Sequence, residues 1–182
     1  MSTLAALALA MIVALAWLGG WAAGSETTSA TGRSTAMDFI LSSTAFDEGG
    51  EIPARHTCDG EDVPLPFNWS GMPEGTAELA LMVDDPDARG FVHWLVVGIP
   101  AEASEIGEAG LPGGAREGRT NFGRTGYGGP CPPSGSHRYT ATLYALSAPL
   151  DLTADPTADE VRSAATGKIL AEARLNGRYA RQ

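Results

Sequence analysis

The stretch Leu79–Val97 reads LALMVDDPDARGFVHWLVV and predicts two neighbouring strands of a sheet. Its two ends, Leu79–Val83 and Phe91–Val97, are short apolar runs rich in valine and aromatic residues, and such runs bounded by proline and glycine are typical of strands. The acidic turn that joins them, Asp84–Asp87, leaves no room for the helix of a parallel crossover. We therefore expect an antiparallel sheet.

A third strand and one helix are predicted further along the chain. Tyr139–Leu146 alternates polar and apolar residues, so one face of this strand should be buried less completely than the other. Thr157–Glu160 matches a capping box, and an apolar spacing of four residues then indicates a helix through Val161, Ala165, Ile169 and Ala173 that ends at Asn176–Gly177. Gly167 costs this helix about 1 kcal/mol relative to Ala, which leaves a break there as the alternative. The fold class is mostly β with a C-terminal helix.

The composition fits one folded domain of an acidic protein. The 182 residues are 43% hydrophobic, which is enough for a single core. A formal net charge of −10 argues against nucleic acid or an anionic membrane face as bulk partners, because both would repel the chain. Any bound anion must be held by a local arrangement of groups. The glycine-rich, acidic stretch Glu102–Gly118 is too polar for a core strand and is expected to be a long surface loop.

The N-terminal part of the chain is expected to lie outside the folded domain. Leu4–Gly24 is 21 residues long without an ionisable side chain, which reaches the length of about 20 residues that a membrane-spanning helix needs. Two interpretations stay open for residues 1–24: a cleaved signal peptide, or a retained membrane anchor. No cysteine follows this apolar run, which excludes a bacterial lipoprotein anchor. Residues 25–36 have the small, polar composition of a linker, and residues 37–182 form the domain. The protein should be exported: periplasmic, secreted or anchored.

Two cysteines, Cys58 and Cys131, lie in the predicted domain. In an oxidising compartment an even number of cysteines favours a disulfide, and closing so long a loop would stabilise the fold by about 4 kcal/mol. Two free thiols beside a pocket are the alternative.

Polar residues gather where the predicted strands end. Pro86 holds Asp85 in an extended conformation at the end of its strand, and Asp87 is expected to cap the turn. His93 lies inside an apolar strand, where it is either a hydrogen-bonded core histidine or part of a site. His137 comes just before the third strand, after a segment made rigid by prolines.

Several spaced motifs carry a resemblance to one family. They are Cys58–Gly60, Trp69–Gly71, Asp84–Ala88, Phe91–Val97, Gly126–Pro133 and His137–Tyr139. In this order they closely resemble the bacterial branch of the phosphatidylethanolamine-binding protein family, also called Raf kinase inhibitor-like proteins, over about Phe39 to Tyr179. The segment Val63–Pro66 departs from the family's Val-Ser-Pro-Pro, because it lacks the serine and moves one proline; any ligand contact from this segment is therefore in doubt.

The resemblance implies a fold and a site. The family packs a large antiparallel sheet against a smaller one and has a small pocket for phosphate or phosphorylated head groups. By resemblance, the pocket is lined by Asp85, His93, His137 and Tyr139, with Pro132 and Pro133 as its rim. Asp87 would belong to the same acidic turn, and Arg138 would point to the opposite face of its strand in a structural role.

A physical account of binding follows from these residue types. Glycines at Gly126–Pro133 would expose backbone N–H donors to an anion, and the prolines would stiffen the loop. His93, His137 and Tyr139 could donate hydrogen bonds, so that a phosphate is held without a lysine. Asp85 could hydrogen-bond a histidine and favour its imidazolium form, or accept from the ammonium of a zwitterionic ligand.

The function that follows is an exported binding protein for a phosphorylated or anionic small molecule. A kinase or protease inhibitor-like role toward an unknown protein partner is the extension that the family suggests, and no cofactor is implied. The alternative is a hydrolase or metal-dependent enzyme built from Asp85, His93, His137 and Cys131. No nucleophile-elbow motif accompanies these residues, and the separation of the two histidines does not match a short zinc motif.

Overall fold

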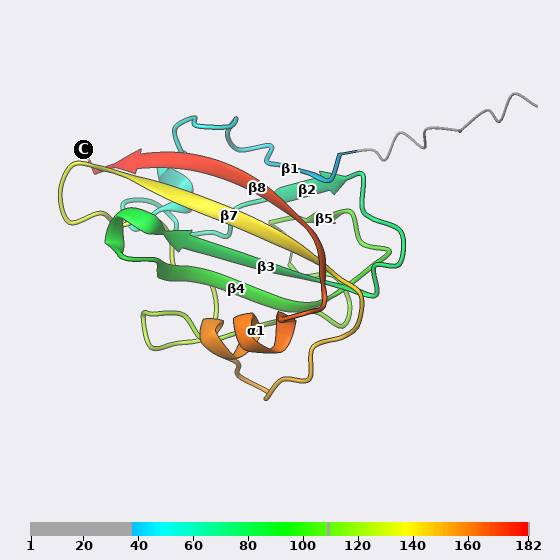
Figure 1. The fold of residues 1–182 in the computed structure, drawn as a ribbon. Coiled ribbons are helices and arrows are strands. Elements are labelled where there is room, and N and C mark those ends of the chain that lie inside the picture. Colours follow the sequence, from blue (N-terminus) through cyan, green and yellow to red (C-terminus); the bar gives the residue numbers. More distant parts are fainter. Residues whose placement is uncertain (1–37, 109, 182) are drawn as a thin grey trace, which may run out of the picture. The chain divides into compact units, whose positions relative to one another are not determined.

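The computed structural model describes residues 38–108 and 110–181. Within them the domain is mostly β, with two antiparallel sheets and one α-helix, as Figure 1 shows. The apolar segment at residues 1–24, the linker at residues 25–36 and the first residue of the predicted domain lie outside the described residues. None of the helices in the described part of the chain has the length and apolar character to cross a membrane.

The large sheet holds five strands and the small sheet three. The large sheet has the order β6 (Arg116–Glu117), β4 (Phe91–Pro100), β3 (Glu78–Asp85), β7 (Ser136–Leu146) and β8 (Ile169–Ala180). The small sheet has the order β1 (Ile40–Ser42), β2 (Phe67–Ser70) and β5 (Glu105–Ile106). Two 3₁₀ turns, η1 (Ala54–His56) and η2 (Pro86–Ala88), and the helix α1 (Ala158–Ala165) complete the fold. The antiparallel pairing of β3 with β4 confirms the prediction from Leu79–Val97.

Both faces of the large sheet are buried over its central strands. One face contributes Leu81, Val83 and Trp94 to a core shared with Phe67 and other residues of the small sheet. The opposite face packs against α1 (orange in Figure 1), where side chains of β3 and β4 meet those of the helix: Ala80, Met82, Leu95, Val161 and Ala165. Burial on both faces explains why β3 and β4 are continuous apolar runs. Strand β7 keeps partly exposed polar residues on one face, as predicted.

The predicted helix is correct at its start and wrong at its end. Thr157 and Glu160 form the capping box, but α1 ends at Ala165. Gly167 then takes a positive φ of 75°, and Ile169 begins the long strand β8, which pairs with β7. A spacing of four residues satisfies the two-residue period of a strand as well as one helical turn, so Ile169 and Ala173 did not distinguish the two structures. The break at Gly167, left open as the alternative, is the one observed.

The stretch Glu102–Gly118 is also more ordered than a surface loop. It contains the short strands β5 and β6, and Ile106 is only 1% exposed in the core beneath the small sheet. The prediction of a purely surface segment is therefore wrong at this residue. Ala103, Leu111 and Ala115 of the same stretch also pack against the core.

Candidate functional site

The turn after β3 is organised by two carboxylates. Asp85 is buried and caps η2: its Oδ1 accepts from the backbone N–H of Ala88 at 3.0 Å. Its Oδ2 pairs with Nδ1 of His137 at 2.6 Å, which joins the end of β3 to the start of β7. Asp87 does not cap the turn as expected; its Oδ2 accepts from the backbone N–H of Arg138 at 2.7 Å. Both carboxylates therefore fix the turn against β7.

From the sequence, Asp85 could either hydrogen-bond a histidine or accept from the ammonium of a zwitterionic ligand. The contacts of its two oxygens distinguish these roles. One oxygen accepts from Ala88 and the other pairs with His137. Both oxygens of the carboxylate are thus engaged within the protein. This geometry favours the histidine partner over the ammonium of a zwitterionic ligand.

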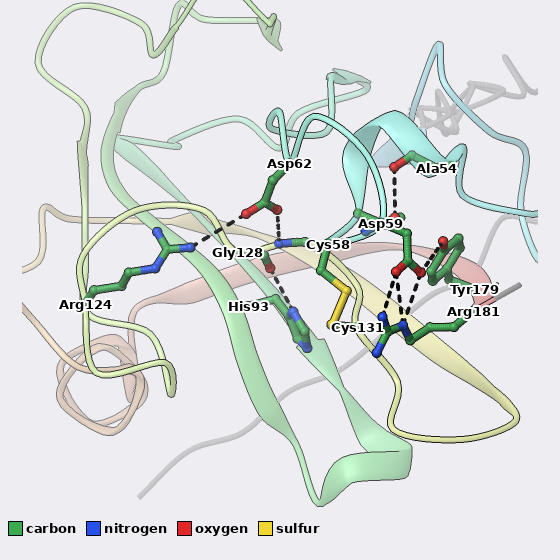
Figure 2. Close-up of a disulfide and its surroundings, with 12 residues drawn as sticks. Ala54, Cys58, Asp59, Asp62, His93, Arg124, Gly128, Cys131, Tyr179 and Arg181 are labelled. Carbon is green, nitrogen blue, oxygen red and sulfur yellow. Dashed lines mark hydrogen bonds and ion pairs between the residues drawn. A yellow bond between two sulfur atoms is a disulfide. The ribbon is translucent and has the colours of Figure 1, made fainter.

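His93 occupies a β-bulge in β4. Val83 pairs with Trp94 and Asp84 pairs with Val92, so His93 is the extra residue between them. A bulge re-aims the side chain that it carries. The carbonyl of His93 accepts from the N–H of Gly128 at 3.0 Å, and its ring Nδ1 lies 2.8 Å from the carbonyl oxygen of Gly128 (Figure 2). The loop after β6 therefore holds both the backbone and the ring of His93.

The surroundings of the His93 ring disfavour its charged form. It is 4% exposed, and burial lowers its pKa, although the hydrogen bond to Gly128 and the negative charge of Asp85 act in the opposite direction. Since a carbonyl oxygen can only accept, Nδ1 carries the proton and donates it to Gly128. The remaining nitrogen, Nε2, then presents a lone pair. This differs from the expectation that His93 supplies a donor to a ligand.

Tyr139 packs beside His93 and brings a hydroxyl without a partner. The two rings meet edge to face with centroids 5.1 Å apart. The side chain is 2% exposed, and its hydroxyl makes no hydrogen bond within the described residues, although the backbone of Cys131 approaches it. Burial, followed by the charge of Asp85, raises the pKa of this hydroxyl far above its ordinary value. A buried polar group without a partner costs about 1–3 kcal/mol, which is uncommon unless a ligand or water completes it.

Aromatic rings close the other side of His93, and one of them was not predicted. Phe91 and Phe122 each lie with their ring centroids 5.2 Å from that of His93. Phe122 is 42% exposed. Its ring fills the space beside Gly128, where an added Cβ would come within 2.4 Å of a ring carbon. The sequence signal for Phe122 was weak, because it is one aromatic residue in a glycine-rich loop.

The glycines of the loop serve close packing rather than exposed donors. The N–H of Gly128 is used by His93, and the N–H of Gly129 donates to Oδ1 of Asp62 at 2.7 Å. A Cβ on Gly129 would lie 2.4 Å from the carbonyl oxygen of His56. The expectation that these two N–H groups face an anion is wrong, because the protein itself uses them. In the same loop Pro132 is buried and Pro133 is exposed.

Cys58 and Cys131 form a disulfide, shown in Figure 2, with their Cα atoms 5.4 Å apart. The bridge and a backbone hydrogen bond from Cys58 to Pro130 at 3.1 Å attach the loop to the segment after η1. Of the two alternatives from the sequence, the structure has the bridge. Cys131 therefore offers no thiol to the hydrolase alternative.

The segment that departs from the family pattern is packed into the domain. Leu65 is 1% exposed, and the carbonyl of Val63 accepts from Nδ1 of His56 at 3.0 Å. Its neighbour Asp62 contributes to the site indirectly through Gly129, which the sequence did not indicate. Arg138 lines a separate groove on the outer face of the large sheet with Asp84 and other polar residues, so it points away from His137 and Tyr139, as expected.

Comparison with known proteins identifies the family. A profile of the phosphatidylethanolamine-binding proteins matches residues 42–180. The chain belongs to this family. It is 44% identical over 148 residues to a UPF0098 protein of Methanothermobacter thermautotrophicus, covering 78% of this chain and 98% of that relative. The family name describes binding rather than catalysis.

Two further similar proteins extend the comparison. The crystal structure of Escherichia coli YbcL, titled a new member of the mammalian family, is similar with a TM-score of 0.74 and 30% identity, over 79% of this chain and 99% of that one. LppC of Mycobacterium tuberculosis, which carries the word lipoprotein in its name, is 37% identical over 97% of this chain and 94% of its own length. These relatives support the resemblance drawn from the motifs.

Proposed function

We propose that this member of the family is a binding protein whose site at the β3–β4 turn takes phosphate or a phosphorylated small molecule. The observation that carries the proposal is the buried hydroxyl of Tyr139, which has no partner among the described residues. A ligand oxygen would complete that hydroxyl and remove its cost of about 1–3 kcal/mol. The site residues His93, His137, Tyr139 and Asp85, with Pro132 and Pro133 beside them, are the ones we assign to it.

Hydrogen-bonding groups rather than net charge would have to hold an anion at this site, because the chain as a whole is acidic. The pair between His137 and Asp85 holds one ring nitrogen of the histidine, so the other nitrogen is directed elsewhere. The residues around it supply no lysine, and a hydrogen-bonded anion of small size fits such a set of donors better than a large polyanion. The stiff loop reduces the entropy that binding must remove.

We also propose that the protein is exported or attached to a membrane. The apolar run Leu4–Gly24 and the similarity to LppC both favour this location. An oxidising compartment is where the disulfide between Cys58 and Cys131 would persist.

The enzyme alternative has less support than the binding function. The disulfide leaves no thiol at Cys131. Among residues 38–108 and 110–181, no three His, Cys, Asp or Glu side chains are grouped so that they could hold a metal ion. No contact in these residues favours a kinase or protease as partner, so the proposal is confined to the small-molecule site.

The test compares two tyrosines of the same strand. Tyr139→Phe removes the unpartnered hydroxyl, whereas Tyr144→Phe removes a hydroxyl from the partly buried, opposite face of β7. Titration of the full-length chain with inorganic phosphate by calorimetry should show binding that Tyr139→Phe weakens about tenfold, which corresponds to one hydrogen bond of about 1.4 kcal/mol. Tyr144→Phe should bind as the native chain does. Absence of phosphate binding to the native chain would remove the proposal.

A further inference from the structure

A groove on the outer face of the large sheet lies apart from the proposed phosphate site. This face carries α1, which packs on β3 and β4, and Arg174 of the neighbouring strand β8 stays exposed on it. This outer groove has a volume of about 400 Å³. Side chains of β3, β7, β8 and α1 line it, among them Asp84, Thr142, Arg162 and Arg174.

The strand register places three of these side chains beside one another. Thr142 of β7 pairs with Met82 of β3 on one side and with Arg174 of β8 on the other, and directly opposite residues share a face of the sheet. Asp84 is two residues further along β3, so it lies about 7 Å along the strand from this row and on the same face. The outer groove thus presents a hydroxyl, a guanidinium and a carboxylate within the span of one small molecule.

Two of these polar groups lack a partner. The hydroxyl of Thr142 makes no hydrogen bond among the described residues, although the residue is only 7% exposed and lines the groove. The carboxylate of Asp84, whose side chain is 25% exposed, accepts no hydrogen bond there either, and Nη2 of Arg162 is 4.0 Å from it. Burial raises the pKa of Asp84, and the arginines around it, Arg162 foremost, offset this effect only in part. Polar groups withdrawn from bulk water in this way usually have a partner, which a ligand would supply.

The arginines of the outer groove favour an anionic group. Arg138, Arg162 and Arg174 line it together with a single carboxylate, Asp84, in a chain whose formal net charge is −10. Arg174 donates to Glu172 at 2.7 Å from one nitrogen, and a guanidinium has five N–H donors, so this pair does not saturate it. A carboxylate matches the planar donors of a guanidinium. Beside Arg174, the groove can therefore hold a ligand carboxylate.

An apolar pocket adjoins the outer groove on the side of α1. It has a volume of about 210 Å³, includes Met82, Ala165 and Ile169 in its lining, and shares Tyr144 and Arg162 with the groove. Ile169 is 41% exposed, so an apolar group from a ligand would remove exposed apolar surface from water here. The small volume suits a short aliphatic side chain rather than a long acyl chain.

We propose that the outer groove and this apolar pocket together bind a free α-amino acid with an apolar side chain, such as leucine. Its ammonium pairs with Asp84, its carboxylate pairs with Arg174 and Thr142, and its side chain enters the pocket beside Met82. An α-amino acid carries these three groups on one carbon atom, which matches an acceptor, a set of donors and an apolar pocket that adjoin one another. The inference does not depend on the phosphate site, because Tyr139 lies on the opposite face of β7 from Thr142.

The test titrates the full-length chain by calorimetry with L-leucine and three probes that each lack one group. Glycine lacks the apolar side chain, 3-methylbutylamine lacks the carboxylate, and N-acetyl-leucine replaces the ammonium by a neutral amide. Leucine should bind, and each probe should bind about tenfold more weakly or worse, because one part of the site is then left unmatched. N-acetyl-leucine with the affinity of leucine would overturn the proposal, since Asp84 would then have no role.

Variants assign each group to its residue. Asp84→Asn keeps the shape of the side chain and removes its charge, so it should weaken leucine about tenfold and leave N-acetyl-leucine unchanged. Arg174→Gln should also weaken leucine about tenfold. Its matched control is Arg178→Gln, which changes the same residue type on the same face of β8 but outside the groove. Equal affinities of these two arginine variants for leucine would overturn the assignment of the carboxylate.

A last comparison separates the two sites. Tyr139→Phe should bind leucine as the native chain does, because its change lies on the other face of the sheet. Loss of leucine binding in this variant would place the amino acid in the phosphate site and overturn the proposal, as would the absence of leucine binding to the native chain. The probe series on the native chain decides the outcome even if a variant does not fold.

Discussion

In the core between the two sheets the buried side chains of β3, β4 and β7 are apolar, whereas toward one end of these strands the buried side chains of Asp85, His93 and Tyr139 are polar. The core is stabilised by buried apolar surface. Leu81 and Leu143 are fully buried, and their neighbours need only be apolar and of the right size. The site end is held by individual hydrogen bonds to Ala88, Gly128 and His137.

Mutations in the two regions should therefore have different effects. A change in the core lowers the free energy of unfolding but leaves the site as it is whenever the chain is folded. A mutation at the site end removes one hydrogen bond and changes the orientation of a functional side chain.

The largest effect is expected from removing the disulfide. Cys58→Ala with Cys131→Ala should lower the free energy of unfolding by about 4 kcal/mol, because the unfolded chain is no longer closed into a loop. Phosphate affinity should fall as well, since the bridge attaches the loop that holds His93. Urea unfolding and calorimetry measure the two effects. A variant that is less stable but binds phosphate as before would show that the hydrogen bonds of Gly128 and Gly129 hold the loop unaided.

A smaller effect, confined to stability, is expected in the core. Leu81→Ala should lower the free energy of unfolding by about 3 kcal/mol, through lost apolar burial and the cavity left behind. The Kd for inorganic phosphate should stay within about twofold at temperatures where the variant is folded, because sites without shared partners behave independently. A parallel loss of affinity in Leu81→Ala would contradict the separation of core and site.

The same contrast explains how much could be predicted from the sequence. The strands at Leu79–Val83 and Phe91–Val97 follow from apolar runs and turn residues, because burial on both faces demands such runs. The end of α1 could not be placed, since a spacing of four residues fits a strand as well as a helix. Gly167 was the informative residue there, and its positive φ ends the helix.

The sequence pointed to the candidate residues, whose role in binding stays a prediction, but it did not indicate their hydrogen bonding. The resemblance pointed to His93, His137, Tyr139 and Asp85, and the structure places these residues in contacting pairs. Which ring nitrogen of His93 carries the proton depends on a bulge in β4 and on the carbonyl of Gly128, which is 35 residues away in sequence. No local sequence pattern indicates either feature. From the sequence, the N–H groups of Gly128 and Gly129 were expected to face a ligand. In the fold they donate to His93 and Asp62 instead.

The smallest effect is expected from pH, and it belongs to the site end alone. The folded protein lowers the pKa of His93 below its ordinary value of about 6.5, so the unfolded chain binds more protons between the two values. This contribution to stability is complete above about pH 6.5 and is lost as the pH falls through the folded pKa. Unfolding free energies between about pH 7 and about pH 5 should fall less in His93→Asn than in the native chain. Leu81→Ala, whose change lies in the core, should keep the full pH dependence. An NMR titration in which the ring of His93 protonates above about pH 6.5 would contradict the lowered pKa.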